Sequence, residues 1–270
     1  MSRLTGLFAA LHETKRSALI PFITAGDPST SGVVSLLHAM VRAGADAIEL
    51  GVPFSDPMAD GAVIQGSSER ALRRGVSLLH VLQWVREFRQ QNDTTPIILM
   101  GYLNPVETLG MQRFAQEAAD VGVDGVILVD MTPEEAEEGS AQLRAAGVDP
   151  IFLLAPTSGS QRVAAVKRLG SGFVYYVSLR GITGAQQQDW DAVLARVAQL
   201  RQELAMPVAI GFGIRDATTA QRLGKGADAV VIGSALVQRL QQATDDADAE
   251  RLVMEFLVPI RKALYAERKV

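Results

Sequence analysis

The chain has 270 residues, which is the usual length of one α/β barrel and long for most other single domains. It has no cysteine and only three histidines, none in a His-x-x-x-His pair, so disulfides, a cysteine nucleophile and a zinc site are not expected. The net charge is −4 with both signs interspersed, which argues against binding to nucleic acid. No apolar run reaches the roughly 18 residues that cross a bilayer, and no signal or transit segment precedes the first expected strand. We therefore expect a cytoplasmic protein with no membrane segment, folded as a single domain over residues 1–270.

A short phrase of the form Gly-x-Asp, followed by an apolar run, recurs along the chain. It begins at Gly44, Gly122, Gly147 and Gly226, at intervals of 78, 25 and 79 residues. These intervals are close to multiples of about 26, a plausible length for one strand-and-helix unit. Glycine accepts the left-handed conformation that ends a helix, aspartate favours a turn, and the apolar run is typical of a parallel strand buried on both faces. The phrase predicts parallel strands that alternate with helices.

The pattern of apolar residues places eight such units in chain order. Strands are expected at 19–24, 47–51, 97–101, 125–129, 150–154, 173–177, 208–211 and 229–233. Amphipathic segments predict helices at 30–43, 78–91, 111–121, 133–146, 160–169, 190–204, 217–223 and 248–267, with extra helices at 3–11 and 62–72. Thr132 followed by Pro133 and two glutamates is typical of a helix start.

Eight strand-and-helix units favour closure into a (β/α)8 TIM barrel with extra N-terminal and loop helices. The alternative is an open, doubly wound sheet. It is disfavoured because no Gly-x-Gly-x-x-Gly turn follows the first strand, where the sequence is TAGDP. In a barrel the active site lies at the carboxyl ends of the strands, so the functional residues are sought in eight short loops.

The end of the second strand offers the strongest catalytic candidate, Glu49. Strand alternation places Ala47 and Glu49 on one face and the bulky Ile48 and Leu50 on the other, where they would pack under the helices. Glu49 would then face the barrel interior, where partial desolvation raises the pKa of a carboxyl and makes it a usable general acid or base. The alternative is a buried structural carboxylate paired with a lysine or arginine.

Two further acids, Asp56 and Asp60, follow in a loop stiffened by Pro53 and Pro57. Asp60 lies at the far end of this loop and is a second catalytic candidate. Its alternative role is the N-cap of the helix expected from Ala62. Spacing alone does not rank Asp56 against Asp60.

Glycines after the seventh and eighth strands suggest a phosphate site. The loops are GFGI at 211–214 and GSAL at 233–236, and each joins glycine to the start of a helix, where free backbone N–H groups favour an anion. The loop at 178–188 has two glycines and no apolar cluster, so it is interpreted as a mobile lid or as an ordinary surface loop. Phe22 and Tyr175 lie in strands and would either line the pocket or belong to the core.

Several of these segments resemble the α subunits of tryptophan synthase. The two most specific are LIPFITAGDP at 19–28 and ELGVPFSDPMADG at 49–61. Further similar segments lie at 100–105, 175–178, 181–184, 211–214 and 233–235, so the resemblance runs in order from about residue 7 to the last helix. Two stretches look variable against the family pattern, at 130–133 and at 179–180.

The resemblance implies a lyase that splits indole-3-glycerol phosphate into indole and glyceraldehyde 3-phosphate by a retro-aldol reaction, without metal or organic cofactor in this chain. It implies that Glu49 is the acid and base of the reaction and that Asp60 holds the indole N–H. Thr183 matches the lid residue that bonds Asp60. The remaining matches are the residues around the ligand, Phe22, Tyr175 and Phe212, and the donors to phosphate, Gly184, Gly213, Gly233 and Ser234.

The resemblance also implies a partner. This is the β subunit of tryptophan synthase, which carries pyridoxal phosphate and receives indole, in an expected α2β2 heterotetramer. Asp56, Pro57, Asn104 and Pro105 match the residues that face this partner.

Three alternatives to this function stay open at the level of the sequence. One is a stand-alone lyase that releases free indole, and another is a different phosphate-binding barrel, an isomerase or an aldolase. A Schiff-base aldolase needs a lysine in the barrel, and all five lysines fall outside the expected strands. The third is an inert subunit that only activates a partner, which the presence of both Glu49 and Asp60 argues against.

Overall fold

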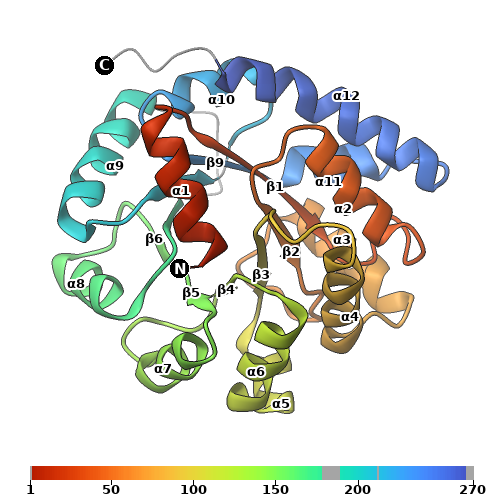
Figure 1. Ribbon diagram of the computed structural model, residues 1–270, viewed down its shortest axis with the longest axis horizontal. Coiled ribbons are helices and arrows are strands. Elements are labelled where there is room, and N and C mark those ends of the chain that lie inside the picture. The colour runs from red at the N-terminus through yellow and green to blue at the C-terminus, as the bar shows by residue number, and fades with distance from the viewer. Residues whose placement is uncertain (1, 178–188, 212, 266–270) are drawn as a thin grey trace.

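The structure, a computed structural model, describes residues 2–177, 189–211 and 213–265. Parallel strands form a barrel with helices around its outside, as Figure 1 shows. Neighbouring strands follow the order β5-β4-β3-β2-β1-β9-β8-β7-β6. The strands are β1 (Ala18–Thr24), β2 (Ile48–Gly51), β3 (Ile97–Gly101), β4 (Gly125–Leu128), β5 (Asp149–Pro150), β6 (Phe152–Leu154), β7 (Val174–Val177), β8 (Val208–Gly211) and β9 (Ala229–Ile232).

The two strands at the ends of this order, β5 and β6, are consecutive pieces of one strand. Only Ile151 separates them, and its backbone N–H donates to the carbonyl of Val126 on β4 at 2.9 Å. The sheet therefore closes on itself through the chain at Ile151, which confirms the predicted eight-stranded barrel. The fifth strand, expected as one piece at 150–154, is instead divided because β5 pairs with β4 and β6 pairs with β7.

Most of the helices lie where the periodicity predicts them. They are α1 (Arg3–Glu13), α2 (Val33–Arg42), α3 (Ala62–Arg73), α4 (Leu78–Arg89), α5 (Leu103–Leu109), α6 (Met111–Val121), α7 (Glu137–Ala145), α8 (Ser160–Leu169), α9 (Trp190–Leu204), α10 (Ala217–Gly224), α11 (Ser234–Leu240) and α12 (Asp246–Leu264). None of the helices in the described residues is long and apolar enough to span a membrane.

The helix start expected at Thr132 is wrong. The hydroxyl of Thr132 donates to the side chain of Glu135 at 3.3 Å, and the backbone N–H of Glu135 donates to the carbonyl of Thr132 at 3.0 Å. These bonds close a separate turn, and α7 begins only at Glu137, after Ala136. The motif typical of a helix start is here satisfied by a turn that does not continue into the helix.

Side chains alternate between the barrel interior and the layer beneath the helices. Ala47 belongs to the interior cluster, whereas Ile48 and Leu50 pack in the outer layer, as the alternation predicts. Helix α1 supplies Leu4, Phe8 and Leu11 to the interior cluster, so it plugs the barrel at the amino ends of the strands. Figure 1 looks onto this end, with α1 in front of the strands.

The aspartates of the recurring phrase bind the strands at the same end. In three of the four phrases the carboxylate accepts a hydrogen bond from a backbone N–H at the start of the preceding strand and pairs with an arginine. The three sets are Asp46 with Leu19 and Arg261, Asp124 with Ile97 and Arg89, and Asp228 with Val208 and Arg201. In the fourth, Asp149 accepts instead from the hydroxyls of Ser2 and Ser171, at 2.8 and 2.6 Å. These aspartates join adjacent strands as well as making a turn.

Candidate active site

Glu49 lies inside the barrel, near the carboxyl end of β2. Its Cα pairs in register with Phe22 on β1 and with Ile98 on β3. The residue is 1 % exposed, and its Oε2 atom has no hydrogen-bond partner among the described residues. No ion pair to Glu49 occurs in the described part of the chain, so the interpretation as a paired structural carboxylate is not supported. Burial, with a smaller contribution from the charge of Asp60, raises the pKa of Glu49 from 4.5 to about 8. At neutral pH this side chain is mainly a neutral acid with a proton to donate.

Asp60 lies at the end of the loop between β2 and α3. Its Oδ2 atom accepts a hydrogen bond from the hydroxyl of Tyr102 at 3.1 Å. Burial raises the pKa of Asp60, and the bond from Tyr102 opposes that rise because it stabilises the carboxylate. The N-cap of α3 is Gly61, without a side-chain bond, so the interpretation of Asp60 as a helix cap is wrong. The Asp60 side chain instead bonds to Tyr102 and lines a small cavity at the barrel mouth.

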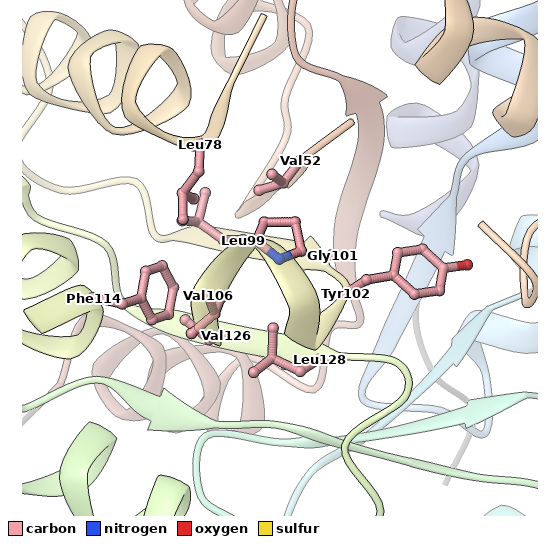
Figure 2. Close-up of a pocket in the computed structure, with 10 residues that line it drawn as sticks. Val52, Leu78, Leu99, Gly101, Tyr102, Val106, Phe114, Val126 and Leu128 are labelled. Carbon is pink, nitrogen blue, oxygen red and sulfur yellow. The ribbon is translucent and has the colours of Figure 1, made fainter. Parts of the chain in front are cut away.

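Tyr102 fixes Asp60 in place, a role that the sequence alone does not indicate. Its hydroxyl also accepts a hydrogen bond from the backbone N–H of Ala59 at 3.0 Å, and its ring stacks on Phe54 with centroids 5.1 Å apart. In Figure 2 the Tyr102 side chain points away from the apolar side chains that line a pocket between β3 and α6, among them Leu99 and Phe114. A tyrosine one residue past the carboxyl end of a barrel strand is the available signal for this role.

The loop that carries Asp60 is held a second time by Gln65 on α3. Its Nε2 atom donates to the carbonyl of Asp60 at 2.8 Å and lies 3.5 Å from the carbonyl of Pro57. The loop backbone is therefore bound from α3 by Gln65 and from the end of β3 by Tyr102. Rigid support of this kind holds a functional carboxylate in one orientation.

Two aromatic rings line the barrel mouth, and glycines make room for them. A Cβ atom on Gly51 would lie 2.6 Å from Cζ of Phe22, and one on Gly233 would lie 3.4 Å from Cδ1 of the same ring. A Cβ atom on Gly211 would lie 2.0 Å from the hydroxyl oxygen of Tyr175. The pKa of Tyr175 is raised well above its ordinary value by burial and by the charges of Glu49 and Asp60. Phe22 and Tyr175 thus belong to the same site as the two carboxyls.

A small cavity opens beside these side chains. It is lined by Phe22, Thr24, Gly51, Val52, Asp60, Ile64, Ser68, Met100, Gly101, Tyr102 and Val129. These residues come from β1, β2, β3, α3 and the segments that follow β2, β3 and β4. The carboxyl of Asp60 is the charged group in this lining, and the other lining residues are apolar or neutral.

The residues expected to bind phosphate lie partly in the described chain. Gly213 follows β8 with a φ of +77°, and Gly233 precedes the exposed Ser234, the first residue of α11. Gly233 is next to the Phe22 ring, which places this loop on the rim of the mouth. Thr183, Gly184 and Phe212 lie outside the described residues, as does the loop interpreted as a lid. The described residues contain no cluster of three or more groups that could hold a metal ion.

The residues expected to face a partner lie on two adjacent segments. Asp56 is exposed and Pro57 half-buried in the loop after β2, while Asn104 is exposed and Pro105 half-buried in the first turn of α5. The backbone N–H of Leu103 donates to Asp130 Oδ1 at 2.8 Å, which ties the variable segment after β4 to α5. Met58, in the same loop as Asp56, is 85 % exposed.

The family model of the tryptophan synthase alpha chain matches residues 8–263. The chain belongs to the tryptophan synthase alpha chain family. It is 63 % identical over 264 residues to the tryptophan synthase alpha chain of Acidithiobacillus ferrooxidans, covering 98 % of this chain and 97 % of that one. It is 56 % identical over 266 residues to the same protein of Cupriavidus taiwanensis, covering 98 % and 100 %.

Solved structures of tryptophan synthase agree with this result. The alpha subunit of Legionella pneumophila is similar with a TM-score of 0.91 and 38 % identity over 98 % of each chain. The aminoacrylate-bound form of tryptophan synthase from M. tuberculosis contains a chain with a TM-score of 0.86 and 31 % identity, covering 98 % of this chain and 100 % of that one. As a tryptophan synthase alpha chain homologue, the protein is an enzyme subunit of tryptophan biosynthesis.

Proposed function

We propose that this chain cleaves indole-3-glycerol phosphate into indole and glyceraldehyde 3-phosphate, as a carbon–carbon lyase that works by acid and base catalysis. The observation that carries the proposal is a pair of carboxyl groups in unlike environments at one barrel mouth. Glu49 is buried, with a pKa of about 8, and Asp60 receives a hydrogen bond that favours its charged form. Groups whose environments separate their pKa values can divide the tasks of acid and anion.

The reaction first needs a proton on the indole ring carbon that bears the glycerol phosphate side chain. In its neutral form Glu49 donates that proton, and positive charge develops on the ring nitrogen. The Asp60 carboxylate accepts the indole N–H and stabilises this charge. General acid catalysis of this kind typically contributes about 10²–10⁴-fold to the rate.

The second step breaks the carbon–carbon bond. The Glu49 carboxylate, now deprotonated, removes the proton of the hydroxyl on the adjacent side-chain carbon. As that carbon becomes the aldehyde of glyceraldehyde 3-phosphate, the bonding electrons return to the ring and neutral indole leaves. Glu49 recovers its proton, so the cycle closes without a metal or organic cofactor in this chain.

The remaining site residues position the substrate in this proposal. Phe22 and Tyr175, with Phe212, would flank the indole ring, and Thr183 would bond Asp60 when the loop at 178–188 closes. The phosphate would accept backbone N–H groups at Gly184, Gly213 and Gly233 and at Ser234. Support comes from Phe22, whose ring lies within reach of Gly233 and so links the indole and phosphate ends of the mouth.

The proposed partner is the β subunit of tryptophan synthase, in an α2β2 assembly in the cytoplasm. The partner would supply pyridoxal phosphate and receive indole. Exposed side chains support this interface, because Asp56, Met58 and Asn104 lie on two segments that a hydrogen bond from Ala59 to Tyr102 joins. Pro57 and Pro105 lie half-buried in the same two segments. A single exposed apolar residue such as Met58 is common on protein surfaces. The support for the interface is therefore that Asp56, Met58 and Asn104 lie on adjacent segments.

An assay of indole release by the full chain, alone and with a β subunit, tests the proposal. Glu49→Gln should abolish indole release while a phosphate ligand still binds, and Asp60→Asn should lower turnover severely but less completely. Glu255→Gln, an exposed acid on α12, is the matched control and should keep full activity. Normal turnover by Glu49→Gln would remove Glu49 from the mechanism, and high turnover by the lone chain would favour a stand-alone lyase.

A further inference from the structure

A second cavity opens at the opposite end of the barrel, where the strands begin. It has a volume of about 670 Å³ and lies between α1, the end of α8 and the segment that joins α9 to β8. Figure 1 looks onto this end, with α8 and α9 to the left of α1. Cavities of roughly 300–1,000 Å³ are typical of sites for small molecules. None of the residues proposed for catalysis contributes to it.

Basic side chains surround this cavity. The helices α1, α8 and α9 carry His12, Lys167 and Arg201 in their last turns, and Arg16 follows α1. Cations at these positions complement the negative ends of the helix dipoles. Because three helices end at one cavity, their cations are also gathered around a single space.

The acid in the cavity lining is already neutralised. Asp228 forms an ion pair with Arg201 at 2.8 Å and accepts a hydrogen bond from the backbone of Val208 at 2.9 Å. Within the described chain, Arg16 and Lys167 form no ion pair. Arg16 stacks over the ring of Tyr265, with 4.6 Å to its centroid, and it lies within electrostatic range of Asp46, which is already ion-paired with Arg261. The cavity therefore carries a net positive charge.

The floor of the cavity is apolar. Phe8 and Leu11 of α1 are almost fully buried, and Met206 and Pro207 lie half-buried at the opposite wall. The hydroxyl of Ser171 donates to Asp149 at 2.6 Å and so has its hydrogen already committed. A ligand would gain free energy by covering the apolar floor and by placing an anionic group among the cations at the rim.

From this arrangement we propose that the cavity binds a small amphipathic anion, with an aromatic or branched apolar body and one carboxylate, sulfonate or phosphate group. The apolar body would lie against Phe8, Leu11 and Met206, and the anionic group near Arg16 and Lys167. This site is separate from the proposed catalytic mouth and does not depend on the reaction proposed there.

Binding of anilinonaphthalene sulfonate, an aromatic anion, tests the proposal by NMR of methionine methyl groups in the full chain. Met206 lines this cavity and Met100 lines the cavity at the barrel mouth, so each methyl group reports on one site. We expect a saturable shift of the Met206 signal without a shift of Met100. The uncharged analogue phenylnaphthylamine should bind more weakly, because it lacks the anionic group.

Variants separate the role of the charges from that of the apolar floor. Lys167→Ala should weaken binding about 2- to 5-fold, and Lys167→Ala with Arg16→Gln about 10-fold, since partly exposed charge pairs are weak. Ala9→Trp, on the α1 wall, should fill the space and remove binding, whereas Lys225→Ala, an exposed lysine outside the lining, should change nothing. Circular dichroism and unchanged indole release would verify that the variants fold.

The proposal is overturned if Met100 responds and Met206 does not, because the probe would then occupy the barrel mouth. Equal binding of the charged and uncharged probes would also overturn it, since the cations would play no part. Unchanged binding in the double variant would have the same meaning.

Discussion

Replacing Glu49 with glutamine should remove activity and, at neutral and alkaline pH, make the protein more stable. The pKa of Glu49 is about 8 in the folded chain and 4.5 when it is exposed to solvent. Between these values the folded protein holds a proton that the unfolded chain releases, so the wild-type protein loses stability as the pH rises from 4.5 through 8. Glutamine does not titrate, so the variant lacks this loss.

The magnitude follows from the two pKa values. Between pH 5 and pH 8 the free energy of unfolding of the variant, relative to wild type, should rise by about 3 kcal/mol. The change with pH is a better measure than the value at one pH, because the buried amide of glutamine adds its own constant cost of about 1–3 kcal/mol when it lacks a partner. The gain should vanish at and below pH 4.5.

Urea unfolding followed by circular dichroism at pH 5, 7 and 8 measures this difference. Glu255→Gln, which replaces an exposed glutamate, should follow the wild-type curve at each pH. A Glu49→Gln variant whose relative stability stays constant across this range would show that Glu49 is ionised at its ordinary pKa in the folded chain. The proposed proton donor would then be absent at neutral pH, and the mechanism would fail with it.

Three other predictions concern the same two ends of the barrel. Indole release should fall as the pH rises through about 8, where Glu49 loses its proton, and a pH–rate profile that stays flat to pH 9 would contradict this assignment. Tyr102→Phe removes the donor to Asp60 and should lower the kcat of indole release about 10-fold or more, because a hydrogen bond to a charged group is lost. A variant with the wild-type kcat would contradict this role of Tyr102. Arg89→Met leaves the buried Asp124 without its closest cation and should lower the free energy of unfolding in urea by about 3–5 kcal/mol. Arg113→Met, which breaks an exposed ion pair, should lower it by less than about 1 kcal/mol. Equal losses in the two variants would refute the expected difference between buried and exposed ion pairs.

Much of the barrel can be predicted from the sequence because its signals are local. Strand alternation alone turns Glu49 inward and Ile48 outward, and the run of parallel strands with short loops gives the fold. The helices α5 and α11 have only seven residues each, too few for a clear periodicity. The division of the fifth strand at Ile151 depends on which neighbour each half binds, and that information does not lie within the segment.

The features that cannot be predicted from the sequence depend on contacts between distant residues. Tyr102 is 42 residues from Asp60, and nothing near either residue indicates that they are bonded. The partner of Asp46 is Arg261, 215 residues away in the chain. The sequence near Asp46 therefore predicts a turn residue and gives no sign of the ion pair. The basic cavity has the same origin, because its cations come from the ends of three helices that are separate in the chain.

The aspartate–arginine sets also show how the last helix relates to the first strand. In two of them the arginine lies on the helix that directly precedes the first strand of the pair: Arg89 on α4 before β3, and Arg201 on α9 before β8. In the third, Arg261 on the last helix takes the same place beside β1, as if α12 ran straight into it. The helices and strands thus follow a circular pattern around the barrel, in which α12 stands to β1 as α4 stands to β3 and α9 to β8.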